Sequence, residues 1–171
     1  MAHCIGFNAV ARSDARVLIL GTLPSVESLK QGQYYAKKQN GFWKILGELI
    51  GASPDLPYEK RLQHLTKNRI ALWDVCKMAE REGSLDAAIQ SPEPNDFHAF
   101  FKTHKYIELI GFNGQPAAKL FNRYVKPDMP EQIKALPCVV LPSTSPAHAG
   151  MRFEEKLSRW RDALGAFVSC A

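Results

Sequence analysis

The chain has 171 residues and a formal net charge of +5; 46% of its residues are apolar and 23% are charged. These values are typical of a globular protein with a single domain, which here would span residues 1–171. A membrane-spanning protein is excluded, because no apolar run approaches the ~18 residues that a transmembrane helix needs. The N-terminus has no basic segment followed by an apolar core, so no secretory signal is predicted and the protein is expected in the cytoplasm.

In chain order, the first predicted element is a buried strand over Val17–Gly21, followed by a loop of about twenty residues. Phe42–Ile50 is predicted as a helix, because its apolar residues recur at helical spacing and Gly51 follows as a C-terminal cap. A second, shorter helix is predicted over Tyr58–Leu65.

Ile70–Val75 is an apolar run that fits a second buried strand, and the region after it is mixed up to Pro94. Asn95 is predicted to cap a helix that continues to about His104. A third strand is predicted over Tyr106–Gly111, and Pro116 fits the first turn of a helix that ends near Val125.

The last predicted strand is Cys138–Leu141, which leads into the loop PSTSPAHAG. The final helix, Arg152–Cys170, has apolar residues on one face and charges opposite. Apolar strands that alternate with helices predict an α/β fold, here a three-layer α/β/α sandwich around a central, mainly parallel four-stranded sheet.

The most unusual sequences of the chain follow three of the four predicted strands: GTLPS, GFNG and LPSTSPAHAG. In open parallel sheets, ligands bind beyond the carboxyl ends of the strands. The sequence therefore predicts a binding site formed by these three loops.

Standard cofactor and metal motifs are missing from the sequence. It contains no GxGxxG, no GxxxxGK[ST] and no GxSxG motif, and its acidic residues do not group as metal ligands. The four cysteines are far apart and are expected to be reduced thiols rather than metal ligands. No cofactor is expected, and the basic charge favours a nucleic-acid partner only modestly.

The polar and aromatic residues near the strand ends fit recognition of a neutral heterocycle. Asn113 follows a strand directly, so its amide can offer a donor and an acceptor to a base edge. Phe42 can stack on the face of the base, and Asn40 can position a water molecule. Structural alternatives are open: Asn40 as a helix cap, Phe42 as a core aromatic, and Asn113 as a turn residue.

The segments GTLPSVES, QYYAKKQNGFW, GFNG and LPSTSPAHAG together resemble the uracil-DNA glycosylase superfamily. Within it, the chain is most similar to the hypoxanthine (deoxyinosine) DNA glycosylase branch, and the resemblance extends from Gly21 to Gly150. It implies an enzyme that acts on DNA and flips a deaminated base, hypoxanthine or alternatively uracil, into a pocket. A monofunctional enzyme is expected, because no lysine is evidently placed for Schiff-base attack, and a monomer is the simplest assumption. Water then replaces the base at the anomeric carbon of the sugar.

The resemblance also implies roles for individual residues. Asn40 occupies the position of the catalytic polar residue in the hypoxanthine branch, and Asn113 would read the base. The other residues expected around the base are Gly21, Leu23, Tyr35 and Phe42. Those expected against DNA are Ser25, Ser143, Thr144, Ser145, Pro146 and His148.

Two positions depart from the pattern of the uracil-specific relatives. Leu23 stands where they have a catalytic Asp or Asn, and Leu141 stands where they often have His or Asn. Efficient excision of uracil is therefore not expected. Two alternatives are open: a uracil- or mismatch-specific glycosylase with unusual catalytic residues, and a catalytically silent nucleic-acid-binding domain of the same fold.

Overall fold

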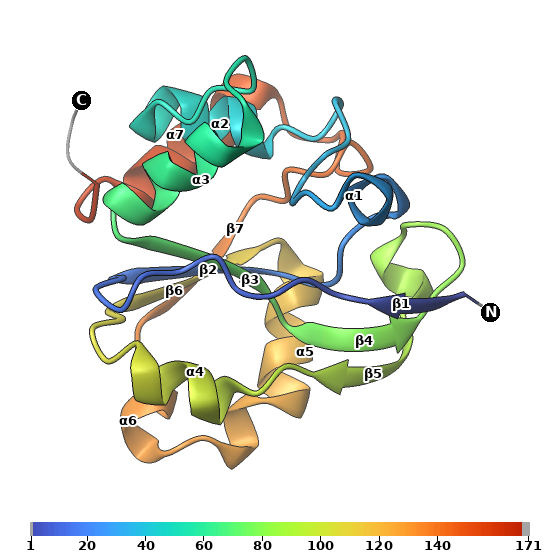
Figure 1. The fold of residues 1–171 in the computed structure, drawn as a ribbon, viewed down its shortest axis with the longest axis vertical. Helices are drawn as coiled ribbons and strands as arrows, with labels where there is room; N and C mark the ends of the chain where they lie inside the picture. The colour runs from blue at the N-terminus through green and yellow to red at the C-terminus, as the bar shows by residue number, and fades with distance from the viewer. Residues whose placement is uncertain (1, 169–171) are drawn as a thin grey trace.

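The central sheet has four parallel strands in the order β3-β2-β6-β7 (Figure 1). In the computed structural model, which describes residues 2–168, these strands are β2 (Val17–Gly21), β3 (Ile70–Asp74), β6 (Leu109–Asn113) and β7 (Cys138–Leu141). The predicted α/β/α fold with a parallel four-stranded sheet is confirmed. Three strand boundaries differ, since β3 ends at Asp74 rather than Val75 and β6 spans Leu109–Asn113 rather than Tyr106–Gly111.

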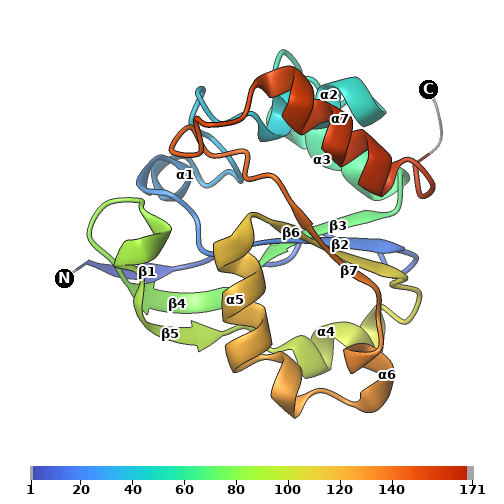
Figure 2. The ribbon, with the colours of Figure 1, turned by 180° about the vertical axis from the view of Figure 1, so that it is seen from behind.

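Helices cover both faces of this sheet (Figures 1 and 2). One layer contains α2 (Phe42–Ile50), α3 (Tyr58–Lys67) and α7 (Phe153–Leu164). The other contains α4 (Phe97–Thr103), α5 (Gln115–Tyr124) and the short α6 (Glu131–Lys134). β2 supplies both cores, because side chains alternate along a strand: Val17 and Ile19 pack under the first layer, and Leu18 and Leu20 under the second.

Several helix boundaries differ from the predicted ones, and one short helix was not predicted. Asp96, rather than Asn95, caps α4 by accepting a hydrogen bond from the N–H of Ala99, whereas Asn95 donates to the carbonyl of Asp74. α7 ends at Leu164, and the predicted C-terminal residue of this helix, Cys170, lies outside the described residues. The long loop after β2 contains a short helix, α1 (Val26–Gln31), which Ser25 and Gly32 cap.

A second sheet was not predicted. It has three antiparallel strands in the order β1-β4-β5, namely β1 (His3–Ile5), β4 (Cys76–Glu80) and β5 (Gln90–Pro94). β4 is only half buried, and β5 carries two prolines, which strands accept mainly at a sheet edge. Neither strand therefore has the apolar run that marked the central strands.

Two 3₁₀ turns complete the chain, η1 (Asp86–Ala88) and η2 (Lys126–Asp128). η1 lies in the loop between β4 and β5, where the sequence suggests a helical turn. None of the helices within residues 2–168 is both long enough and apolar enough to cross a membrane.

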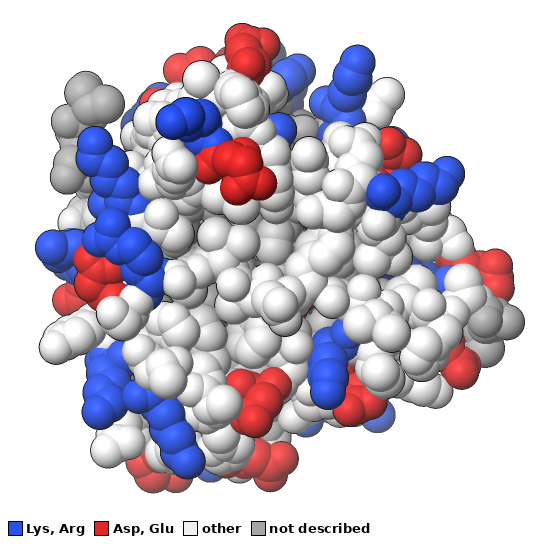
Figure 3. All heavy atoms as spheres, viewed as in Figure 1, with Lys and Arg blue, Asp and Glu red and all other residues white. Residues whose placement is uncertain are grey.

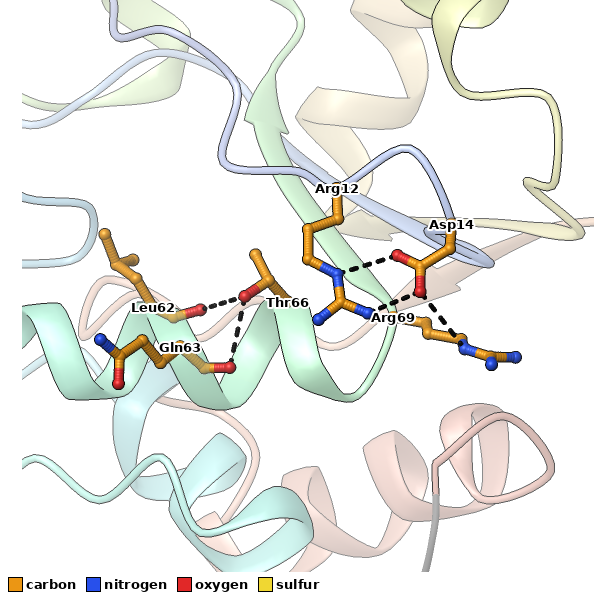
Figure 4. Close-up of polar contacts among 6 residues, drawn as sticks. All are labelled: Arg12, Asp14, Leu62, Gln63, Thr66 and Arg69. Carbon is orange, nitrogen blue, oxygen red and sulfur yellow. Dashed lines mark hydrogen bonds and ion pairs between the residues drawn. The ribbon is translucent and has the colours of Figure 1, made fainter.

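Several arginines lie at the amino ends of the central strands, away from the predicted site. There the carboxylate of Asp14 accepts from Arg12 at 3.0 and 2.6 Å and pairs with Arg69 at 3.7 Å (Figure 4). Arg16, which precedes β2, pairs with Glu108. These basic side chains are matched by acids, so they do not form an unpaired cationic surface.

Candidate active site

A pocket of about 440 Å³ opens at the carboxyl ends of β2, β3 and β6. The strands contribute their last residues, Gly21, Asp74 and Asn113. Most of the residues that the sequence indicates for the site line this pocket: Gly21, Leu23, Ser25, Tyr35, Asn40, Asn113, Ser143, Thr144, Ser145 and Pro146. Phe42 and His148 do not.

Thr144 connects two of the loops that form the pocket. The side-chain amide of Asn113 donates to the Thr144 hydroxyl at 3.0 Å, and the N–H of Thr144 donates back to Asn113 Oδ1 at 3.0 Å. The carbonyl of Thr144 accepts from the N–H of Gly41 at 2.9 Å, next to Asn40. Thr144 is 3% exposed, so it holds Asn113 in one orientation and is badly placed for the phosphate contact expected of it.

This pairing leaves Asn113 with hydrogen-bonding capacity for a ligand. Its amide nitrogen has two donors and its oxygen has two lone pairs, and Thr144 uses one of each. The remaining donor and acceptor lie side by side on one amide, which also interacts with the Tyr35 hydroxyl at the pocket. Such an edge is complementary to a base edge that offers an acceptor next to an N–H.

Asn40 lines the pocket and precedes Gly41, the N-cap residue of α2, so that its side chain caps the helix from one position further out. Its Oδ1 accepts from the N–H of Phe42, the first residue of α2, at 3.0 Å. A carbonyl oxygen has two lone pairs, so one remains for a water molecule, and Nδ2 has no partner among the described residues. The cap therefore orients the amide without occupying it, and the two roles considered for Asn40 are compatible.

Phe42 is placed differently from the expectation. It is fully buried and does not line the pocket. Tyr35 stacks on its ring, with the centroids 4.1 Å apart, while Trp43 and Trp160 contact it edge-on. The expected stacking of Phe42 on a base does not fit this arrangement, because Tyr35 already covers the ring and Phe42 acts as a core aromatic.

The loop after β7 is held by α7. The N–H of Ser145 donates to Ser143 Oγ, and the N–H of Ala147 donates to Ser145 Oγ, both at 3.2 Å. Lys156 Nζ donates to the carbonyl of His148 at 2.7 Å. His148 lines a neighbouring groove, not the pocket, so a contact with a base is not supported, whereas a contact with the DNA backbone fits its exposure.

The two leucines that depart from the uracil-specific pattern have different surroundings. Leu23 lines the pocket and packs on Cys4, Cys76 and Ala79. Leu141 is 2% exposed and belongs to the core, where it contacts Gly111. Neither position offers a polar group to a substrate.

The loop between β4 and β5 forms another part of the rim, which sequence reasoning missed. Asp86 accepts from the hydroxyl of Thr22 at 2.6 Å, and Ser84 accepts from the N–H of Val26 at 3.0 Å. These bonds attach the loop to the GTLPS segment, where Ser25 caps α1 by accepting from the N–H of Ser28. Ser25 is thus a cap that also faces the pocket.

Asp74 is the other site residue that was missed. It ends β3 opposite Gly21 and is only 4% exposed. Burial raises the pKa of its carboxyl to about 7, with a further contribution from Asp86, while Arg81 lowers it. A carboxylate at the end of the apolar run IALWD was the signal that could have identified it.

Gly21 leaves no room for a side chain at this point. A Cβ at position 21 would lie 2.6 Å from Asp74 Oδ1 and 2.8 Å from the Tyr35 hydroxyl. Gly21→Ala is therefore expected to lower the free energy of unfolding by about 1–3 kcal/mol, measured by urea denaturation. Gly150→Ala is the matched control, because nothing lies within 4 Å of its Cβ position; an equal loss in both variants would contradict this prediction.

The chemistry available in the pocket is that of amides, hydroxyls and one buried carboxyl. Within residues 2–168 there is no cluster of three or more His, Cys, Asp or Glu residues that could hold a metal ion. Preorganised amides can hold a polar heterocycle and a water molecule in fixed positions. The arrangement therefore suits replacement of a heterocyclic leaving group by water.

Comparisons with known proteins agree with this geometry. The sequence model of the Uracil DNA glycosylase superfamily matches residues 7–164. A hypoxanthine DNA glycosylase from Methanosarcina acetivorans is 45% identical over 115 residues, which are 67% of this chain and 73% of that protein. One from Methanosarcina barkeri is 37% identical, with the same shares covered. The solution NMR structure of a candidate uracil DNA glycosylase from M. acetivorans has a TM-score of 0.81 at 36% identity, covering 97% of this chain and 99% of that one.

Proposed function

This chain belongs to the uracil DNA glycosylase superfamily, and on that premise we propose that it is a monofunctional DNA glycosylase that excises hypoxanthine from DNA. One observation carries the proposal. Asn40 and Asn113, on different loops, are linked through Gly41 and Thr144 and line one pocket. Both amides retain free hydrogen-bonding capacity, as a neutral base and an attacking water require.

Each amide has a separate task in the proposed reaction. The target nucleotide leaves the duplex and its base enters the pocket, where the free edge of Asn113 pairs with it. Asn40 accepts a hydrogen bond from a water molecule and aims its oxygen at the anomeric carbon. The C1′–N bond breaks with its electron pair on the base, and the water oxygen bonds to C1′ as its proton leaves to solvent.

The DNA backbone would meet the rim formed by Ser25, Ser143, Ser145, Pro146 and His148. On the face in Figure 3, lysines and arginines lie around the margin with acidic side chains among them, while the centre is uncharged. Lys37 is an exposed cation on the pocket rim itself. We assign it to phosphate binding, because the hydrolysis above needs no amine nucleophile.

Duplexes with a single inosine, uracil or G·T mismatch test the proposal. Each is incubated with protein and then treated with alkali, which cleaves the strand at abasic sites. Cleavage at inosine supports hypoxanthine excision. Cleavage only at uracil or at the mismatch favours a uracil- or mismatch-specific glycosylase. Binding without any cleavage favours a catalytically silent DNA-binding domain. Covalent trapping by borohydride would contradict monofunctional hydrolysis and would direct attention to Lys37.

Leu85 is expected to fill the gap that the flipped base leaves. It is 63% exposed on the pocket rim, whereas the large apolar residue of the loop after β7, Met151, lines the neighbouring groove and not the pocket. Inserted apolar side chains stabilise unstacked duplexes. Burying a leucine contributes about 1.5–3 kcal/mol, so Leu85→Ala is expected to lower kcat/KM on duplex inosine DNA about tenfold or more.

Single-stranded inosine DNA is the internal comparison for Leu85, because a strand without a partner has no gap to fill. The variant should cleave it at the wild-type rate. Ile5→Ala is a matched control, since Ile5 is an exposed apolar residue, 57% accessible, on β1 and outside the pocket. Equal losses on single and double strands would assign Leu85 to the pocket itself.

The proposal further describes a monomer that works in the cytoplasm without a cofactor. Base flipping needs one protein copy per lesion. The described cysteines, Cys4, Cys76 and Cys138, are free thiols, which agrees with a reducing compartment. Sedimentation of the protein with and without inosine DNA would test the monomer.

A further inference from the structure

Asp74 and Tyr35 both place polar atoms beside Gly21 at the pocket. Asp74 Oδ1 lies 2.6 Å, and the Tyr35 hydroxyl 2.8 Å, from the point that a Cβ at position 21 would occupy. Both residues line the pocket. The absence of a side chain at Gly21 thus brings the two groups next to the space that a ligand would fill.

Both groups have unmet hydrogen-bonding capacity. The Tyr35 hydroxyl and Asp74 Oδ2 are buried without a partner at full hydrogen-bonding geometry, and within residues 2–168 only Arg81 Nε shares this condition. The Tyr35 hydroxyl has a weaker interaction with the side-chain amide of Asn113, which lowers the pKa of Tyr35 against the larger effect of burial. Leaving such a group unpaired costs about 1–3 kcal/mol. The Tyr35 hydroxyl lies beside Gly21, and the unpaired Oδ2 belongs to the carboxyl whose Oδ1 lies beside the same glycine. This coincidence indicates a use other than stability.

The backbone of Tyr35 is also strained. Its φ of 53° lies in the left-handed region, which is unfavourable for a tyrosine. The stacking of its ring on Phe42 holds it there. Strained residues persist where the surroundings fix them and cluster at active sites. Strain and unpaired polar atoms therefore coincide at the end of β2.

The charges around Asp74 favour its protonated form. Asp86 from η1 repels a negative charge at Asp74, and Arg81, which follows β4, opposes this effect. The other titratable groups that interact with Asp74 are Tyr34, Tyr35 and Cys76, all with pKa values raised mainly by burial. With a pKa of about 7, Asp74 carries a proton in a large fraction of molecules at neutral pH and is then a hydrogen-bond donor.

We propose that Asp74 is a catalytic residue of the hydrolysis proposed above, donating a hydrogen bond from its carboxyl to an acceptor atom of the flipped 6-oxopurine. The inference rests on the proposed function and adds to it the group that stabilises the departing base. The ring nitrogens and the 6-oxygen of hypoxanthine are acceptors. A bond to one of them strengthens as the base gains negative charge, so it stabilises the transition state more than the bound substrate.

The donation leads to a balanced proton transfer. The C1′–N9 bond breaks with its electron pair on the purine, and the Asp74 proton neutralises that charge. The attacking water bonds to C1′ and releases one proton to solvent, from which Asp74 is protonated again. The products are neutral hypoxanthine and an abasic site, and no co-reactant other than water is consumed.

Single-turnover kinetics of Asp74→Asn on inosine duplex test the inference. The amide keeps the shape and a donor but has no acidic proton. At about pH 6 the variant is expected to react about a hundredfold more slowly than wild type, a typical contribution of a general acid. The wild-type rate should fall about tenfold per pH unit once the carboxyl is ionised, above about pH 7, whereas the rate of the variant should not fall in this way.

Two measurements separate chemistry from structure. Asp74→Asn should bind a duplex with a reduced abasic site as wild type does, because that ligand has no base. Tyr35→Phe keeps the stacked ring and the carboxyl, so it should retain the fall in rate above neutral pH. A flat profile in Tyr35→Phe, or loss of abasic-site binding in Asp74→Asn, would overturn the role of Asp74.

The failure of this inference differs from the failure of the proposed function. If wild type releases no base from inosine DNA, both are overturned. If wild type is active and Asp74→Asn matches its rate and pH profile, the glycosylase stands and Asp74 has no part in its chemistry.

Discussion

Replacing Asn40 with alanine is expected to lower the single-turnover rate of hypoxanthine release at least about a hundredfold, as loss of a group that positions the attacking water typically does. The Asn40 amide is oriented by the N–H of Phe42 and borders the pocket with its Nδ2 free. Alanine removes both the acceptor for water and the cap of α2. Rapid-quench measurement on inosine duplex, followed by alkali, gives the rate.

The stability of the same variant separates the two functions of Asn40. Loss of an N-terminal cap typically costs about 1 kcal/mol. Asn40→Ser is the matched control, because serine caps as well as asparagine but is too short to reach the same water. Its stability should stay near wild type while its rate falls like that of Asn40→Ala. Unchanged rates together with a lowered melting temperature in Asn40→Ala would mean that Asn40 is only a cap.

Asp74→Asn is expected to gain stability relative to wild type as the pH rises. The pKa of Asp74 is about 7 in the folded protein, against 3.8 for an ordinary aspartate. Below about pH 4 the carboxyl is protonated in both the folded and the unfolded state, so its ionisation does not change the free energy of unfolding. Between about pH 4 and 7 the unfolded chain loses this proton first, so the folded state of wild type becomes relatively less stable.

Above about pH 7 the Asp74 carboxyl of wild type is ionised in both the folded and the unfolded state. The whole loss of folding free energy caused by its raised pKa is then present. The interval between the two pKa values corresponds to about 4 kcal/mol at 1.36 kcal/mol per pH unit. The difference in unfolding free energy between Asp74→Asn and wild type should therefore grow by an amount of this order from about pH 4 to pH 8. Urea unfolding at both pH values measures it, and a difference independent of pH would contradict the raised pKa.

The two Asp74 experiments together describe a conflict between stability and activity. The same buried carboxyl that destabilises the fold at high pH is the proposed proton donor to the base. A variant that is more stable yet slower would show that the site retains a costly group for its chemistry. A variant that is more stable and equally fast would leave the burial of Asp74 without a catalytic explanation.

Much of the fold was predictable because its signals are local. The four apolar runs became the four parallel strands, and Phe42–Ile50 was predicted with the bounds that the structure has. The antiparallel sheet was not predictable, because β4 is half buried and β5 contains two prolines. β4 pairs with β5 and with β1, and these pairings are not indicated by any pattern within β4 or β5.

The candidate site was predictable in its position and only partly in its residues. Asn113, predicted to follow a strand, is the last residue of β6, and the pocket opens where the strand ends meet. Phe42 was assigned to the base as an aromatic ring that can stack on a heterocycle, but the left-handed backbone of Tyr35 places another ring on it. Thr144 was assigned to phosphate, but its hydroxyl is buried against Asn113.

The sequence alone determined the α/β class, the sheet edge that carries the site, and the family, since these follow from periodicity and from short motifs. The tertiary structure decided which side chains share the pocket. The pairing of β2 with β3 places Asp74 opposite Gly21, and the loop after β7 places Thr144 on Asn113. Such contacts join residues far apart in the chain, and they depend on strand register and packing, which no local pattern encodes.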